Sequence, residues 1–108
     1  MKKISLSISP DGLFALEKLL NQVPDFRPTM FEGFVIKSAC IDVAEMVHRK
    51  YRKVSGEFDV FNNKKKIKIN LKYHECYHLL QFMTIMESIT PLHFHLQTIK
   101  NFLDQKTA

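Results

Sequence analysis

Glycine, cysteine and long hydrophobic runs are scarce in this sequence, and tryptophan is absent. The three glycines are scattered and form no phosphate-binding loop. Two cysteines, Cys40 and Cys76, are too few for a disulfide framework. Because both fall among apolar positions, we expect buried, unreactive thiols in a reducing compartment. No apolar run approaches the roughly 20 residues that cross a bilayer, and Pro10 interrupts any signal-peptide core. We therefore expect a cytoplasmic protein with no membrane partner.

What is present is typical of a single globular domain spanning residues 1–108. Apolar residues make up 45% of the chain and charged residues 25%, which is enough to fill a core and to cover it with a hydrated surface. The net charge of +5 is unevenly distributed, because segments 48–53 and 64–72 together hold more than half of the 16 lysines and arginines. Such clustering favours a polyanionic partner, although lysine-rich surfaces also serve solubility alone.

Two segments of the chain share one hydrophobic pattern. Residues 2–23 align with residues 65–86 at an offset of 63. In both, apolar residues first alternate with polar ones, as a half-buried strand requires, and then recur at helical spacing. The alternating positions are Ile4, Leu6 and Ile8 in the first segment and Ile67, Ile69 and Leu71 in the second. The helical positions are Leu13, Leu16, Leu20 and Val23 in the first and Cys76, Leu79, Met83 and Met86 in the second.

A second helix is expected in each half. In the first half, Thr29 and Glu32 match a capping box at the start of an apolar helix that runs from position 31 to about 47. In the second half, Thr90 and Pro91 predict an N-cap and a first helical residue. The apolar stripe of that last helix consists of Leu92, Leu96, Ile99 and Leu103.

These patterns predict an α+β fold built by internal duplication, (β-α-α)x2, with a two-stranded antiparallel ribbon covered by four helices. The halves span about 2–52 and 65–106 and are joined by a loop-like linker at 53–64, in which Phe58 and Val60 leave a short extra strand open. Two unrelated segments with matching patterns are the alternative to a duplication. The helix at 30–47 is apolar around most of its circumference, so we expect it to be central or to pack on a partner chain.

The segment at 74–78 matches the pattern H-E-x-x-H of zinc peptidases. In such a site His74 and His78 would bind zinc and Glu75 would activate a zinc-bound water. A third ligand is required, and His93 or His95 in the following helix could supply it. This zinc hydrolase is the remote alternative for the chain.

Two observations favour an accidental match. The longer metzincin pattern needs glycine and histidine where this sequence has Gln81 and Thr84. The repeat also places Glu75 in the first turn of a helix that directly follows a strand, where a carboxylate is favoured without any metal. We therefore predict no catalytic residues, no metal and no cofactor, and a protein that is not an enzyme.

The order strand, helix, helix, present twice, resembles the ribbon-helix-helix DNA-binding family in a single-chain, tandem form. The resemblance implies that the two strands pair antiparallel and lie in the major groove of DNA, where outward side chains contact bases. Lysine can donate to guanine, asparagine can pair with adenine, and serine accepts several bases. The implied nucleic-acid-binding residues are Lys3, Ser5 and Ser7 in the first copy and Lys66, Lys68, Asn70 and Lys72 in the second.

The chain departs from this family between its helices. The family has a tight turn there and holds a DNA phosphate at the N-terminus of the second helix. This sequence has the longer segment 23–31, a carboxylate at Glu32, and Pro91, which lacks an amide donor. The chain is also similar to small proteins of bacterial mobile elements, which implies no activity. A polar ribbon face can equally serve solubility, so the alternative to DNA binding is a protein-interaction module that self-associates through the 30–47 helix.

Overall fold

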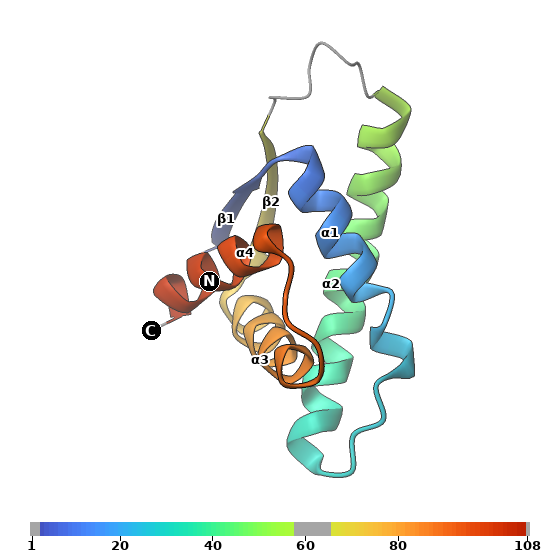
Figure 1. Ribbon diagram of the computed structural model, residues 1–108, viewed down its shortest axis with the longest axis vertical. Coiled ribbons are helices and arrows are strands. Elements are labelled where there is room, and N and C mark those ends of the chain that lie inside the picture. The colour runs from blue at the N-terminus through green and yellow to red at the C-terminus, as the bar shows by residue number, and fades with distance from the viewer. Residues whose placement is uncertain (1–2, 58–65, 108) are drawn as a thin grey trace.

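The computed structural model describes residues 3–57 and 66–107, and it has an α+β architecture (Figure 1). The sheet consists of two antiparallel strands. Four helices and one short 3-10 turn accompany it. The elements in chain order are β1 (Lys3–Ile8), α1 (Pro10–Leu20), the 3-10 turn η1 (Val23–Asp25), α2 (Phe31–Glu57), β2 (Ile67–Lys72), α3 (Tyr73–Ile89) and α4 (Phe94–Thr107). The predicted fold class, a two-stranded antiparallel ribbon with four helices, is confirmed.

The ribbon has one buried and one exposed face, as the alternation predicted. Leu6 lies opposite Ile69, and Ile8 lies opposite Ile67. These four side chains and Leu71 are buried in the core. Because side chains alternate between the two faces of a strand, the polar residues between them point away from the core.

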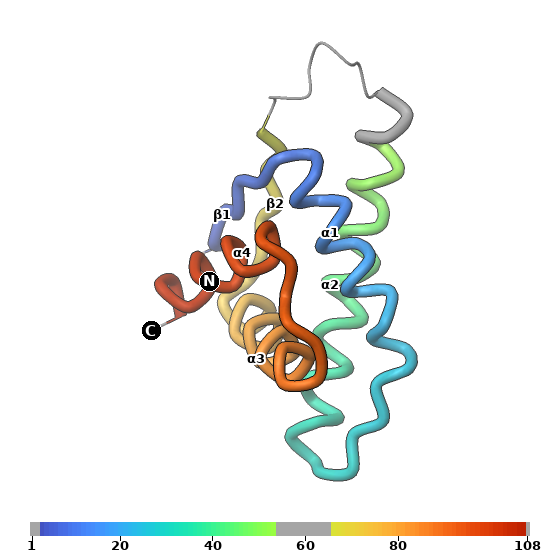
Figure 2. Tube along the Cα trace, in the orientation of Figure 1, coloured from blue at the N-terminus to red at the C-terminus, as the bar shows by residue number. Residues whose placement is uncertain are grey.

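The helices cover the buried face of the ribbon. Helices α1 and α3 begin directly after the two strands, and their N-caps, Ser9 and Lys72, have nearly the same extended backbone. Helix α2 runs along the longest axis of the molecule and packs against α1 and α3, while α4 packs against the same two helices (Figure 2). Their fully buried side chains include Leu13, Leu16, Leu20, Cys76, Leu79 and Met83. The predicted core positions are therefore confirmed except at Met86, which is half-buried, and the buried Val23 lies in η1, just after α1.

Corresponding helices of the two halves start at the same spacing. Helices α1 and α3 begin at Pro10 and Tyr73, and α2 and α4 begin at Phe31 and Phe94, so each pair of starts is 63 residues apart. Buried residues recur at this spacing in the second helices as well, at Ile36 and Ile99, and at Cys40 and Leu103.

Helix α2 begins at Phe31, as expected, but differs from the expectation in its cap and its end. The carbonyl of Met30, not Thr29, accepts the first helical hydrogen bonds, from Gly33 and Phe34. The same helix continues to Glu57, five residues into the segment expected to be a linker. Its last turns include Arg49, Lys50, Arg52 and Lys53, which are good helix formers. The suggested strand at Phe58 and Val60 lies outside the described residues.

The start of α4 was predicted wrongly. Thr90 is the C-cap of α3, because its N–H donates to the carbonyl of Met86 at 2.9 Å. Pro91 then lies in the connection between the helices, and α4 begins three residues later, with the carbonyl of His93 accepting from Gln97. A threonine before a proline is compatible with the end of one helix as well as the start of the next, because the residue before proline favours extended backbone.

Helix α2 has two apolar faces with different surroundings. One stripe, at Ile36, Cys40, Val43 and Val47, is buried between α1 and α3. Near the start of the helix a second face, including Phe31, stays exposed. The expected central position is thus confirmed for one stripe only. Over the described residues, no helix combines the length and the hydropathy that crossing a bilayer requires.

Candidate nucleic-acid interface

The outer face of the ribbon carries three cross-strand pairs of polar residues. Lys3 lies opposite Lys72, Ser5 opposite Asn70, and Ser7 opposite Lys68, and all six residues are exposed. Lys66 precedes β2 by one residue and is exposed as well. The structure therefore brings six of the seven proposed DNA-contacting residues onto one surface and places the seventh at its end.

This outer face carries only positive charge, together with neutral polar side chains. Its six paired positions include three lysines and no carboxylate. Like charges directly opposite each other on a ribbon are unfavourable for folding, and Lys3 and Lys72 form such a pair. A bound polyanion would relieve that repulsion, because each phosphate would neutralise part of the lysine charge.

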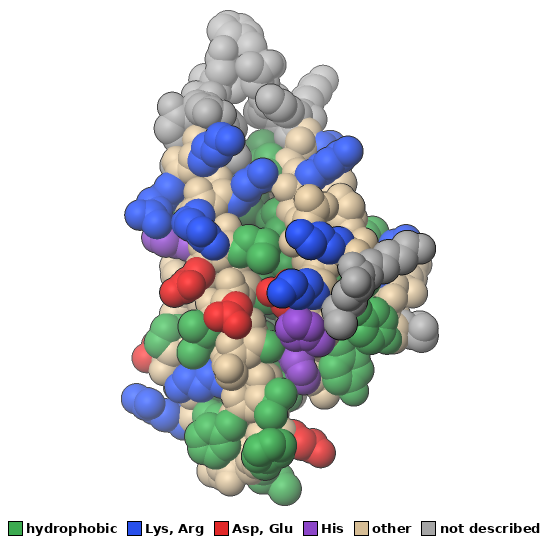
Figure 3. Space-filling model, turned by 180° about the vertical axis from the view of Figure 1, so that it is seen from behind, with side chains coloured by type: hydrophobic (Ala, Val, Ile, Leu, Met, Phe, Trp, Pro, Cys, Tyr) green, Lys and Arg blue, Asp and Glu red, His purple; other side chains and the backbone are tan. Residues whose placement is uncertain are grey.

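Further basic residues lie on the C-terminal half of α2. Arg49, Arg52 and Lys53 are exposed there. Seen from behind, most lysine and arginine side chains of this face lie in its upper part, which holds the ribbon and the end of α2 (Figure 3). Hydrophobic side chains gather at the lower end, where α2 begins, next to further lysine or arginine side chains. On this face, basic side chains are therefore concentrated towards the ribbon and the end of α2, and apolar ones towards the start of α2.

The H-E-x-x-H segment forms the first turns of α3. One carboxylate oxygen of Glu75, Oε1, accepts the backbone N–H of Lys72 at 2.8 Å, and the side chain is buried. His74 is exposed, while Nδ1 of the half-buried His78 lies 2.8 Å from Oε1 of Gln81. Glu75 therefore serves as a helix cap. Among the described residues, no three His, Cys, Asp or Glu side chains are grouped closely enough to hold a metal ion.

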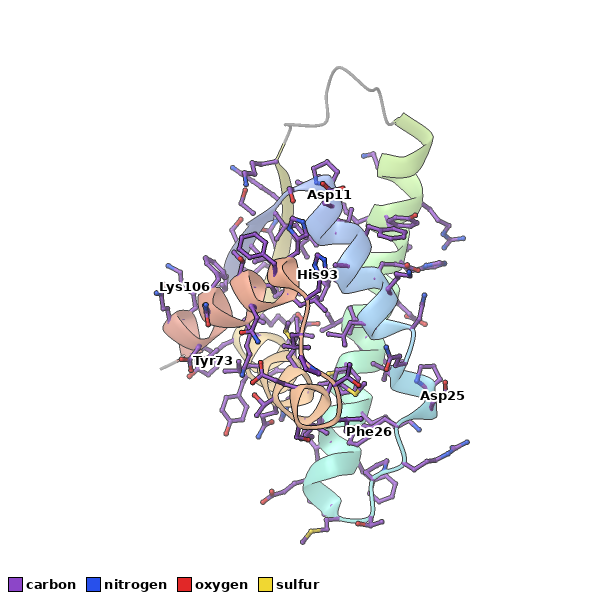
Figure 4. The ribbon with its side chains drawn as sticks, in the orientation of Figure 1. Asp11, Asp25, Phe26, Tyr73, His93 and Lys106 are labelled. Atoms are coloured by element: carbon purple, nitrogen blue, oxygen red, sulfur yellow. The ribbon has the colours of Figure 1, made fainter. Side chains whose placement is uncertain are left out.

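The other two histidines of this region lie in a different place. The rings of His93 and His95 are stacked with their centroids 5.3 Å apart. Both line a groove of about 460 Å³ between α1 and the start of α4, on whose other side lie Asp11 and Phe14 (Figure 4). His74 and His78 line a separate groove between α2 and α3.

These grooves occupy corresponding places in the two halves, and sequence reasoning did not identify them. The second one, with adjoining volumes of about 340 and 370 Å³, lies between α3 and the start of α2 and is lined in part by Phe31, Phe34 and Tyr77. Tyr77 is 63 residues after Phe14, and both are exposed aromatic residues. The sequence signal for the grooves is this set of aromatic side chains outside the buried stripes.

Both cysteines are free and buried, as predicted. The Cys40 thiol donates to the carbonyl of His78 at 3.6 Å and so joins α2 to α3. Burial raises the pKa of Cys40 to about 12, and burial together with the nearby charge of Glu75 raises the pKa of Cys76 to about 11. Because a thiolate is the reactive form, neither cysteine is an activated nucleophile at neutral pH.

In comparisons with known proteins, no family model, curated protein or solved structure matches this chain. A function is therefore inferred from its own residues and their geometry.

Proposed function

We propose that this protein is a small, non-enzymatic DNA-binding protein that lays the outer face of its ribbon in the major groove. The observation that carries the proposal is the ribbon itself: six exposed outward side chains, of which three are lysines, one is asparagine and none is acidic. A two-stranded ribbon fits the width of the major groove, where lysine and asparagine have complementary partners on base edges.

A duplicated origin of the two halves is part of this proposal. It is supported by the constant spacing of 63 residues between the starts of corresponding helices and between corresponding buried residues. Two strands related by an approximate two-fold axis suit duplex DNA, whose backbones have the same symmetry. This arrangement supports the resemblance to a tandem ribbon-helix-helix protein.

The phosphate contacts are proposed to come from lysine and arginine side chains more than from helix N-termini. The first turn of α2 carries the carboxylate of Glu32 and the exposed ring of Phe31, and a negative charge at that place repels phosphate. Lys3 and Lys72 at one end of the ribbon, Lys66 at the other, and the basic end of α2 can take this role.

The test is binding of a short mixed-sequence duplex, measured by fluorescence anisotropy at several salt concentrations. We expect affinity to fall steeply with salt and the K68E/K72E variant to lose binding. The K18E/R27E variant changes the net charge equally but alters exposed residues of α1 and of the connection before α2, so it should bind much more tightly than K68E/K72E. Equal binding by the wild type and K68E/K72E would end the proposal.

A second candidate function is self-association through the exposed start of α2, and a specific observation favours it. The residues Phe31, Phe34 and Tyr77 are 81%, 56% and 44% exposed. If an aromatic residue presents about 200 Å², these three alone expose roughly 350 Å². With Met30 and Val35 beside them, the patch is at the upper end of what ordinary monomers expose and approaches the area of a weak interface.

Sedimentation equilibrium over a range of concentrations tests this second candidate. The wild type should associate, and F31S/F34S should stay monomeric. Phe94 is the residue that corresponds to Phe31 in the second half and is 74% exposed, so F94S serves as the matched control and should associate as the wild type does. A wild type that is monomeric at the highest concentration would rule this function out.

A further inference from the structure

The antiparallel pairing of β1 and β2 has a central residue pair, and a half-turn about this pair relates one strand to the other. Leu6 lies opposite Ile69, which is also the residue 63 positions later. A half-turn about this point superimposes β1 on β2 and exchanges Ser5 with Lys68 and Ser7 with Asn70. The same half-turn exchanges the two pairs that flank the centre on the outer face, Ser5–Asn70 and Ser7–Lys68.

The two halves of the outer face therefore share a backbone but differ in chemistry. Next to the centre, one half offers Ser5 and Asn70, and the other offers Ser7 and Lys68. An asparagine amide makes a two-point contact with adenine, lysine donates to guanine O6 and N7, and serine is permissive. A base sequence that suits one half is consequently a poor match for the other.

The two ends of the ribbon share one lysine and differ by another. Lys3 corresponds to Lys66, so each end keeps one exposed lysine for phosphate. Lys72 corresponds to Ser9, but the hydroxyl of Ser9 accepts the N–H of Gly12 at 3.1 Å and caps α1. Ser9 is thus occupied within the protein, and Lys72 adds an exposed cation at one end only.

We propose that the DNA target is non-palindromic, with Asn70 reading adenine in one half and Lys68 reading guanine in the other. This inference rests on the proposed function. The two residues are two positions apart on β2 with both side chains outward, a separation of about 7 Å along a strand. That distance corresponds to roughly two base-pair steps, so the adenine and guanine contacts should be close neighbours.

The experiment is selection of bound duplexes from a randomised library by the full chain. The wild type should enrich a non-palindromic motif. N70A should lose its preference at one base pair, and K68A at another about two steps away, each by about ten- to a hundredfold in discrimination. The S5K/S7N variant makes the two central pairs equivalent and should enrich a motif closer to an inverted repeat. All four altered residues are exposed, and circular dichroism checks that each variant is folded.

The outcomes separate the inference from the function on which it rests. A palindromic motif selected by the wild type, or binding without sequence preference, would overturn the proposal of a non-palindromic target. It would leave the proposal of DNA binding intact. Preference changes in N70A and K68A that fall at the same base pair would also overturn it. If no duplex is retained by the wild type, the proposed function itself fails.

Discussion

Leu6 of β1 lies directly opposite Ile69 of β2, and both side chains are buried under the ribbon. These two residues are 63 positions apart, the same spacing that separates the starts of corresponding helices. The central pair of the ribbon therefore has the spacing that also separates the corresponding helices. Because both are almost fully buried aliphatic side chains, we expect them to make similar contributions to stability.

Replacing either of them by alanine should be costly. We expect L6A and I69A each to lower the free energy of unfolding by about 2–5 kcal/mol, because each leaves a cavity in a closely packed core. The double variant should lose less than the two losses added together, because the side chains are cross-strand neighbours. Urea unfolding measures all three. S5A on the exposed face should stay within about 0.5 kcal/mol of the wild type, and a negligible cost for I69A would contradict the expectation.

Two glycines provide a matched pair of packing tests. A Cβ atom added at Gly33 would lie 2.5 Å from Cβ of Pro28, whereas one added at Gly12 would lie 3.4 Å from the Ser9 hydroxyl oxygen. We expect G33A to be destabilised by about 1–3 kcal/mol through overpacking. G12A should be neutral or slightly stabilised, because alanine favours helix. Thermal unfolding of both variants measures the difference, and equal midpoints would show that the connection before α2 moves freely.

If Glu75 is a helix cap and not part of a zinc site, substitutions and metal should affect stability in a different way. E75A removes the acceptor of the Lys72 N–H and should cost about 1 kcal/mol, while H74A at an exposed position should cost less than about 0.5 kcal/mol. The unfolding midpoint should not change with chelator or with added zinc. Stoichiometric metal in protein purified without chelator, or equal losses in both variants, would restore the metal interpretation.

An ion pair between α3 and α4 should make stability depend on pH. Lys100 donates to Glu87 at 2.8 Å, and Gln97 donates to the same carboxylate, so the pKa of Glu87 is lowered, chiefly by the hydrogen bond from Lys100. Because the folded-state pKa is the lower one, the stabilisation is present above the ordinary glutamate value of about 4.3 and is lost as pH falls through the folded value. The stability difference between the wild type and E87Q should therefore shrink below about pH 5. Urea unfolding between pH 6 and 3 measures it, with E45Q on α2 as the control.

The two strands, and the helix that follows each of them, were predictable from the sequence. Their apolar residues recur without interruption, at every second position in the strands and at helical spacing in the helices. Ile4, Leu6 and Ile8 alternate with polar residues, and the change of period at Pro10 marks the start of α1. The same alternation identified the outward residues of the ribbon. When one face of a strand is buried, the side chains between the buried ones must point outward.

Boundaries set by tertiary contacts were not predictable. Thr90 and Pro91 carry the local signature of a helix start, yet Thr90 closes α3. The chain then needs three more residues before α4 begins at Phe94. Likewise, the apolar stripe of α2 ends at Val47, and the good helix formers that follow it, among them Arg52, do not by themselves fix how far the helix continues beyond the core. The grooves between the halves are lined by residues that are distant in sequence, such as Phe14 and His93. These residues come together only because α1 packs against α4.

Both partners of the ribbon belong to one polypeptide. The pairing of β1 with β2 is thus an intramolecular event, and it should survive dilution that would dissociate a ribbon assembled from two chains. The same covalent link frees the strands from having to be identical: a change at Ser5 need not be matched by a change at Lys68. Each strand can accumulate its own substitutions, an evolutionary route that is closed to two identical subunits.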